Sequence, residues 1–261
     1  SQLSAISFPD SVTTLGSGVL EGCANLTRID LSDNLTTLPD SFAKDLTKLE
    51  SITLPSKLEV VPVSAFENCT TLTSVHSDGV ITKFNDSAFR GCTSLTTLDF
   101  DMAISSIGSR AFQKCTSLTS FEIKNEGNQT KVSNYAFRDN PQMDLILNAT
   151  VTSDGDQAKT LDVKSISMAV GSKLSGFPIG AYGSSIQELN VYDKSYNGGG
   201  PVTAIPTVIG KLGSEGTTVY YVEEDGSKEK LDPKYIHPDG LYQMEDFSFS
   251  EYGDTYPADL G

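Results

Sequence analysis

The sequence predicts an α/β solenoid: a right-handed coil with one short parallel strand per turn and short helical or 3₁₀ turns on its convex side. Three observations lead to this prediction. One segment recurs every 23 residues, apolar residues keep fixed spacings within each copy, and the apolar content is modest at 38%. A solenoid needs fewer apolar residues than a globule, because its narrow core runs the length of the molecule and much of each turn faces water.

The repeat is clearest in three segments that begin at Ala65, Ala88 and Ala111 and read AFENCTTLTSV, AFRGCTSLTTL and AFQKCTSLTSF. Catalytic motifs do not usually recur at a short fixed interval, whereas structural units do. The first leucine-like position of each unit gives five steps of 23 residues and a last step of 25. These positions are Leu3, Leu26, Leu49, Leu72, Leu95, Leu118 and Met143.

Each unit is expected to contain one strand. Apolar residues return three and five positions after the leucine, as in Ile6 and Phe8 or Ile52 and Leu54. This L-x-x-I-x-L pattern combines an anchoring turn with the two-residue period of a strand. Pro55 then ends the strand, because proline offers no amide to a ladder.

A second apolar pair follows each strand, and small polar residues then lead into an Ala-Phe pair. Ser, Asp and Asn at these positions can cap a single helical turn on the opposite side of the coil. Stacked coils would place identical positions about 4.8 Å apart. We therefore expect an internal aromatic column begun by Leu20, with a slightly shifted turn where the pair reverses to Phe42 and Ala43. The expected column consists of Phe66, Phe89, Phe112 and Phe137.

The complete unit, L-x-x-I-x-L-P-x-x-V-x-x-I-x-x-x-A-F-x-x-C, resembles the BspA-type leucine-rich repeats of bacterial cell-surface proteins. Residues 3–142 match it over six consecutive units. The resemblance implies a leucine-rich-repeat fold and a surface-exposed role in adhesion or partner binding. It brings no catalytic residues with it.

The repeat pattern also suggests how the chain is divided. Residues 1–142 are expected to form six regular repeats, and residues 143–222 longer, degenerate repeats of the same solenoid, with a small separate domain as the alternative. Residues 223–261 are rich in acidic residues and tyrosine. An open solenoid end exposes core and an unpaired strand edge, so this segment is expected to be a C-terminal cap, or else a disordered tail.

The formal net charge of −15 bears on partners. It argues against nucleic acid, because few cations are present to neutralise phosphates, and against anionic lipid. No apolar run is long enough to span a bilayer, so we expect no membrane insertion. No basic start precedes an apolar stretch, so we expect no signal peptide within this sequence. We expect a trimmed piece of a longer exported precursor, located outside the cell or on its surface.

Four cysteines fall at one repeat position, which Leu46 and Asn140 occupy in other units. A zinc site would need convergent pairs at short spacing. Disulfides between neighbouring coils are within reach, but leucine in the same position favours free, buried thiols. The cysteines are Cys23, Cys69, Cys92 and Cys115. No metal site and no cofactor are expected.

Candidate binding residues are expected on the outward strand positions of a polar, concave sheet. They are Arg28, Asp30, Glu50, His76, Asp99 and Glu122. His76 should face solvent with Thr53 and Asp99 as stacked neighbours. A His-Asp contact would resemble part of a hydrolytic triad, but no serine is distinguished beside it.

The same reasoning places Asp99 and Glu122 about one strand spacing apart. Two such carboxylates could attract calcium or imitate the paired acids of glycosidases. Convergent carbonyl ligands and a pocket-forming insertion would be needed as well, and the sequence indicates neither.

The sequence therefore favours an extracellular, non-enzymatic binding or adhesion module that presents its concave sheet to a protein or glycan and acts as a monomer. A structural stalk or spacer in a larger surface protein is the alternative. A polysaccharide-acting enzyme of the parallel β-helix type is a distant third, because such enzymes usually break the regularity of their coils to build a groove.

Overall fold

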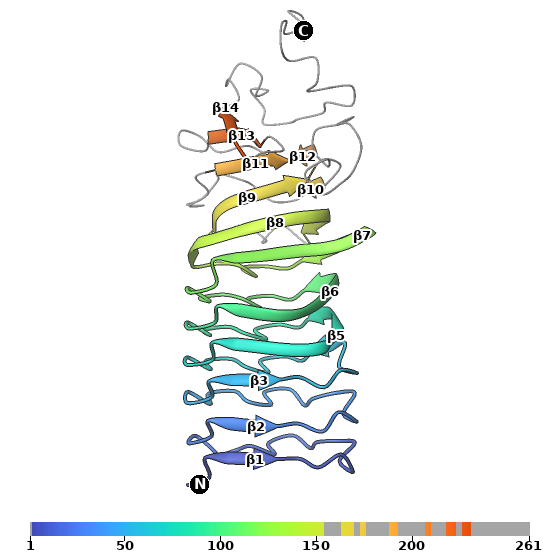
Figure 1. Cartoon of the computed structure of the whole chain (residues 1–261), viewed down its shortest axis with the longest axis vertical. Coiled ribbons are helices and arrows are strands. Elements are labelled where there is room, and N and C mark those ends of the chain that lie inside the picture. Colours follow the sequence, from blue (N-terminus) through green and yellow to red (C-terminus); the bar gives the residue numbers. More distant parts are fainter. Residues whose placement is uncertain are drawn as a thin grey trace, which may run out of the picture.

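The computed structural model describes residues 2–153, 163–169, 173–175, 188–192, 207–209, 218–222 and 226–230. They form an elongated stack of β-coils in which successive strands lie side by side (Figure 1). The strands are β1 Ala5–Ser7, β2 Arg28–Asp30, β3 Ser51–Thr53, β4 Val60–Val61, β5 Ser74–Phe84, β6 Thr97–Ile107, β7 Ser120–Val132, β8 Asn140–Ser153, β9 Val163–Ala169, β10 Lys173–Ser175, β11 Glu188–Tyr192, β12 Thr207–Ile209, β13 Thr218–Val222 and β14 Lys228–Lys230.

The strands pair in two sheets. β1 and β2 form a two-stranded parallel sheet. The larger sheet runs in the order β3-β5-β6-β7-β8-β9-β11-β13-β14, and only its last pair, β13 with β14, is antiparallel. Neighbouring strands are one repeat apart, since Ile52 pairs with Val75 and Val75 pairs with Leu98. The predicted solenoid of stacked parallel strands is confirmed.

Strands β5 to β8 are longer than the short strands predicted, at 11 to 14 residues. They continue into the second apolar pair, where Phe84, Ile107 and Val132 are successive register partners. Each of these coils therefore contributes two paired segments. Within β5, Gly79 passes so close to the preceding coil that a Cβ atom on it would lie 2.1 Å from the carbonyl oxygen of Ser56.

The predicted helical or 3₁₀ turns on the far side are wrong, because no helix occurs in the described part of the chain. Left-handed residues flank the Ala-Phe pairs, for example Ser64 at φ 53° and Asn68 at φ 60°, and a right-handed helix cannot pass through them. Their amides point along the stack instead. The amides of Ser64, Phe66 and Asn68 donate to carbonyls of the next coil at 2.7 to 2.9 Å.

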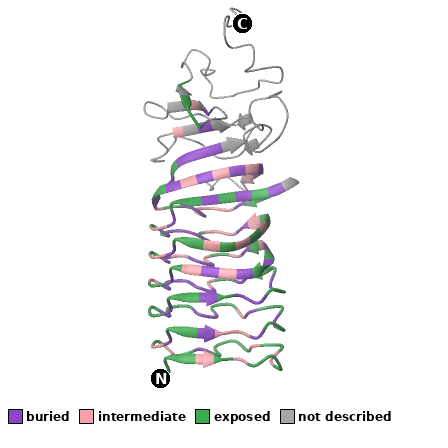
Figure 2. Cartoon of the chain, in the orientation of Figure 1, coloured by how far each residue is buried: buried purple, intermediate pink, exposed green. Residues whose placement is uncertain are grey.

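The predicted aromatic column is confirmed. Phe66, Phe89, Phe112 and Phe137 stack with ring centroids 5.1, 5.5 and 5.6 Å apart and nearly parallel planes. Phe42, from the reversed pair, meets Phe66 edge-on at 6.4 Å instead. Figure 2 shows buried residues recurring at corresponding places in successive coils. The fold therefore leaves only the outward sides of the strands and turns free for function.

Candidate binding face

The outward sides of β1, β2, β3, β5, β6 and β7 form one polar surface, here called the strand face. Parallel register places equivalent residues of successive coils next to one another. Thr53 pairs with His76, and His76 pairs with Asp99. The predicted neighbours of His76 are therefore confirmed, and the face presents columns of polar side chains one strand apart.

The central contact of the strand face joins β5 to β6. Asp99 Oδ2 lies 2.8 Å from His76 Nδ1, and Asp78 Oδ1 lies 3.4 Å from Nε2. The hydrogen bond with Asp99, aided by the charges of Asp99 and Asp78, raises the pKa of His76 above its ordinary value. The imidazole lies between two carboxylates that favour its charged form.

Other predicted residues of this face lie apart from that contact. Arg28 and Asp30 pair with each other on β2, with Nε 2.9 Å from Oδ1, and the Arg28 side chain is 71% exposed. Glu50 is exposed just before β3 and its carbonyl accepts a hydrogen bond from the amide of Thr73. The structure thus brings together His76 with Asp99 and Arg28 with Asp30, and it leaves these pairs and Glu50 apart along the stack.

Glu122 is not the strand neighbour of Asp99, which corrects the sequence-based expectation. Registered pairing of β6 with β7 is confined to Ser106 with Lys131 and Ile107 with Val132, so the first halves of these strands are not laddered together. Glu122 instead accepts a hydrogen bond from the side-chain amide of Asn148 on β8. The two carboxylates therefore do not form the paired site considered above.

An open hollow of about 380 Å³ lies where β6 and β7 part. Leu98, Phe100 and Met102 of β6 line it and are only half-buried. Phe121 of β7 lines it too and is 2% exposed. At the corresponding positions of β5, Val75 and other inward residues are fully buried. The strand face therefore contains a depression with apolar residues of the core at its floor and a largely polar lining around them.

The hollow was not predicted from the sequence, although a signal for it existed. The leucine positions advance by 23 residues from Leu95 to Leu118, but Lys131 lies 25 residues after its partner Ser106. Two extra residues therefore lie between Leu118 and Lys131. These two residues are the reason that the last step of the repeat, from Leu118 to Met143, is 25 residues long. A longer segment in a regular stack must leave the common register somewhere.

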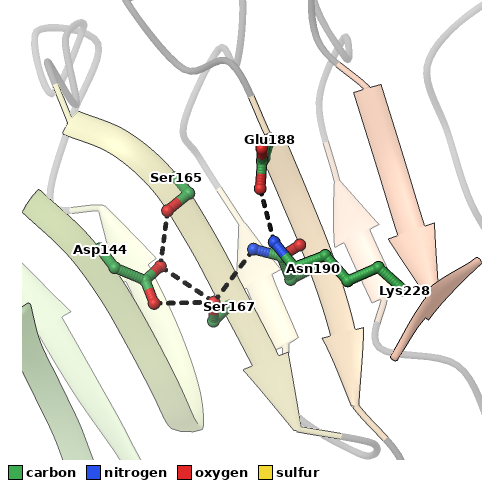
Figure 3. Close-up of polar contacts among 6 residues, drawn as sticks. All are labelled: Asp144, Ser165, Ser167, Glu188, Asn190 and Lys228. Carbon is green, nitrogen blue, oxygen red and sulfur yellow. Dashed lines mark hydrogen bonds and ion pairs between the residues drawn. The ribbon is translucent and has the colours of Figure 1, made fainter. Parts of the chain in front are cut away.

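A second polar cluster follows the face beyond β7 (Figure 3). Asp144 of β8 accepts hydrogen bonds from Ser165 Oγ at 2.8 Å and Ser167 Oγ at 2.9 Å, both on β9. Asn190 Nδ2 of β11 lies 3.4 Å from Ser167 Oγ. The serine hydroxyls donate to a carboxylate and not to an imidazole, so the cluster links strands without activating a nucleophile. Its alternating serines were also missed in the sequence.

On the turn side, Glu67 binds cations from both neighbouring coils. Its two carboxylate oxygens lie 3.0 Å from Lys44 Nζ and 2.9 Å from Arg90 Nη1. Burial alone would raise the pKa of Glu67, but hydrogen bonds from Lys44 and Ser64 and the charges of Lys44 and Arg90 lower it overall. This triad ties three coils together.

The four cysteines are free in the structure, and Cys23 is only half-buried. The thiols of Cys69, Cys92 and Cys115 each donate to a main-chain carbonyl of the preceding coil at 3.0 to 3.1 Å. Burial raises the pKa of Cys69 to about 12 and also raises the pKa values of Cys92 and Cys115. These thiols are hydrogen-bond donors of the core and not nucleophiles.

The described residues contain neither a cluster of metal-binding side chains nor a membrane-spanning helix. No cluster of three or more His, Cys, Asp or Glu side chains with the geometry to hold a metal ion lies among them. That part of the chain also contains no helix that is long and apolar enough to cross a membrane.

The repeats match a known family model. The model for the BspA type leucine-rich repeat region matches residues 1–95 and 40–160, with six copies. The chain belongs to this BspA-type family. Membership indicates a role in protein interaction or in structure. The matched residues include the leucine, isoleucine and Ala-Phe positions that build the core described above.

Two further comparisons add context to the BspA-type assignment. No curated protein matches the chain. Among solved structures, the chain is similar to a leucine-rich repeat protein from Bacteroides ovatus, with 14% sequence identity and a TM-score of 0.43. The match covers 74% of this chain and 66% of the Bacteroides protein, which is just under two thirds of that protein's length.

Proposed function

We propose that this BspA-type protein is a non-enzymatic binding module on a bacterial cell surface. The protein acts as a monomer, and its strand face recognises a protein or a glycan. One observation carries the proposal: parallel register across β3, β5 and β6 places polar side chains from successive coils in a column, formed by Thr53, His76 and Asp99. An extended array of this kind suits a large partner better than a small substrate.

The chemistry of the strand face supports binding and not catalysis. His76 lies between the carboxylates of Asp99 and Asp78, and Arg28 is paired with Asp30. Exposed charged pairs contribute little to folding stability. The charged side chains on this face are therefore available to bind a partner. The repeat family is associated with bacterial surfaces, which agrees with an extracellular location.

Arrays of glycans and of surface or host proteins test this proposal with the labelled chain. We expect saturable binding that falls in a variant carrying Arg28→Ala, His76→Ala and Asp99→Ala together. The control carries Asp33→Ala and Glu59→Ala, two exposed changes outside the strands. Binding that survives the triple variant unchanged would contradict recognition by the strand face.

A structural spacer is the second candidate function. The observation that favours it is the continuity of the large sheet, whose pairing runs from β3 to β13 through successive coils. A spacer depends on length and not on the chemistry of one face. Removal of one complete coil, residues 72–94, would then abolish the native phenotype, while the triple variant would leave it intact.

A further inference from the structure

The hollow between β6 and β7 exists because a regular ladder is interrupted. β5 pairs with β6 from Ser74 with Thr97 onward, and β7 pairs with β8 from Ser120 with Asp144 onward. Between them, pairing begins only at Ser106. On both sides of the opening the strands therefore pair from their first residues, with register shifts after His76 in β5 and after Lys124 in β7, whereas the first halves of β6 and β7 are not paired with each other.

Side chains replace the missing main-chain contacts at the far end of the opening. Asn125 Nδ2 donates to the carbonyl oxygen of Ile104 at 2.9 Å, and Thr130 Oγ1 donates to the same oxygen. Asn125 is 8% exposed and Thr130 is fully buried. A buried carbonyl must be satisfied, and here two side chains of β7 reach it in place of a ladder amide. The hydrogen bonds of Asn125 and Thr130 to the Ile104 carbonyl, here called the latch, therefore mark the far end of the opening.

The rim of the opening is charged, whereas its floor is apolar. The floor is made by Leu98, Phe100 and Met102, and apolar groups left half-exposed in an open depression favour an apolar partner. The rim carries Asp101 and Glu122, both exposed, and Lys124 at one end. Asp99 lies next to this rim on β6. The rim is therefore predominantly acidic.

We propose that this opening binds an extended basic peptide segment of a partner protein. One apolar side chain of the segment enters the hollow over Phe100, and Lys or Arg side chains on either side meet Asp101 and Glu122. Its main chain runs along β6 and β7 where their pairing is interrupted, as in recognition by strand addition. Side chains two residues apart project to the same side of an extended chain, which matches one apolar floor flanked by charges.

Other occupants fit less well. A glycan would leave the apolar floor without a hydrophobic partner, and an acidic segment would meet Asp101 and Glu122 with the same charge. The acidic end of this chain, residues 223–261, is excluded as the occupant on that ground. The inference rests on the proposed binding function and narrows the partner to a peptide in one stretch of the strand face.

Fluorescence anisotropy with synthetic peptides tests the inference on the full chain. The probe is acetyl-KTLTKV-amide labelled with fluorescein, and the control probes are its acidic counterpart ETLTEV and the polar counterpart KTSTKS. We expect saturable binding of the basic probe below about 1 mM and at least about tenfold weaker binding of both controls.

Two variants localise the binding. Ser120 is exposed and lines the hollow, so Ser120→Trp fills the hollow without altering a buried residue; we expect about tenfold weaker binding of the basic probe. The matched control is Ser51→Trp, at the same strand position of β3 and away from the hollow. The double variant Asp101→Lys with Glu122→Lys should reverse the preference toward the acidic probe.

The outcomes separate this inference from the broader function. Absence of saturable binding by the basic probe, or equal effects of Ser120→Trp and Ser51→Trp, overturns the peptide site. The array experiment above is independent of the hollow, because its triple variant leaves every lining residue unchanged. An array ligand that still depends on His76 would keep the binding function while the peptide site is rejected.

Discussion

His76 and Asp99 form an ion pair across neighbouring strands, with Nδ1 2.8 Å from Oδ2. They are register partners one repeat apart, on β5 and β6. The contact therefore exists only when two coils stack in this register. It reports at once on the fold and on the surface that we assign to binding.

The first prediction concerns the pH dependence of this pair. Because the hydrogen bond with Asp99 raises the folded-state pKa of His76, the pair stabilises the fold below the ordinary pKa of histidine. That contribution disappears as the pH rises through the raised pKa. NMR titration of the His76 ring should show a midpoint above 6.5, and Asp99→Asn should bring it down. The resonance is assigned with His237→Gln, and an unchanged midpoint in Asp99→Asn would show that the pair does not form.

The second prediction concerns Glu67, whose pKa the cations Lys44 and Arg90 lower. A depressed carboxyl pKa contributes stability above the unfolded-state value, and this stability is lost as the pH falls through the folded-state pKa. Glu67→Gln should therefore cost about 1 kcal/mol at pH 7 and almost nothing in acid. Urea unfolding at both pH values measures the difference. A cost that is equal in acid and at neutral pH would mean that charge is not the cause.

The third prediction concerns thiol reactivity. Cys69, Cys92 and Cys115 are buried donors with raised pKa values, whereas Cys23 is half-buried. A thiol reagent such as DTNB should modify Cys23 first and the other three only when the coils open. The Cys23→Ser variant should lose the fast phase alone. Fast modification of all four thiols in the folded protein would argue against the buried column.

The fourth prediction compares two phenylalanines of the core. Phe89 stacks on both neighbouring rings and is fully buried, whereas Phe42 makes one edge-on contact and is 4% exposed. Phe89→Ala should cost about 3–5 kcal/mol, and Phe42→Ala less, because fewer ring contacts are lost there. The free energy of unfolding in urea decides between them, and a larger cost at Phe42 would contradict the column as the main source of stability.

The fifth prediction concerns Asn140, which takes the cysteine position of its coil. Its Nδ2 donates to the carbonyls of Phe112 and Phe137, but its Oδ1 is buried without a partner. Asn140→Cys should retain one donor and remove the unsatisfied oxygen, which gains up to about 1 kcal/mol. The control variant Asn140→Ala removes both the hydrogen-bond donor and the unsatisfied oxygen. A less stable cysteine variant would show that the amide contacts outweigh the orphaned oxygen.

Much of the fold could be predicted from the sequence because it is set by local repetition. The leucine positions, the strand spacing and the Ala-Phe pairs recur with the same period, so a single unit predicts its neighbours. The turns could not be predicted correctly, since residues such as Ser64 and Asn68 adopt left-handed conformations that their side chains permit but do not demand. Contacts between coils select those conformations.

The candidate site was predictable only in part. His76 and Asp99 follow from the period, because both lie at the same position of consecutive units. The opening beside Glu122 depends on where two extra residues are absorbed, and the sequence allows that at any point between Leu118 and Lys131. The latch formed by Asn125 and Thr130 settles the place, and such a contact between side chains and a distant carbonyl has no sequence signature. The division into residues 1–142, 143–222 and 223–261 remains a prediction.

The interruption of the sheet beside Phe100 is the central structural claim, and residue-resolved amide hydrogen exchange tests it most directly without any ligand. We predict that, in the first halves of β6 and β7, the amides directed at the gap between the two strands exchange faster than the amides that pair with β5 and β8, and that protection across the gap returns from Ser106 and Lys131 onward. Equal protection along all four strands would show that β6 and β7 are laddered throughout and that no opening exists.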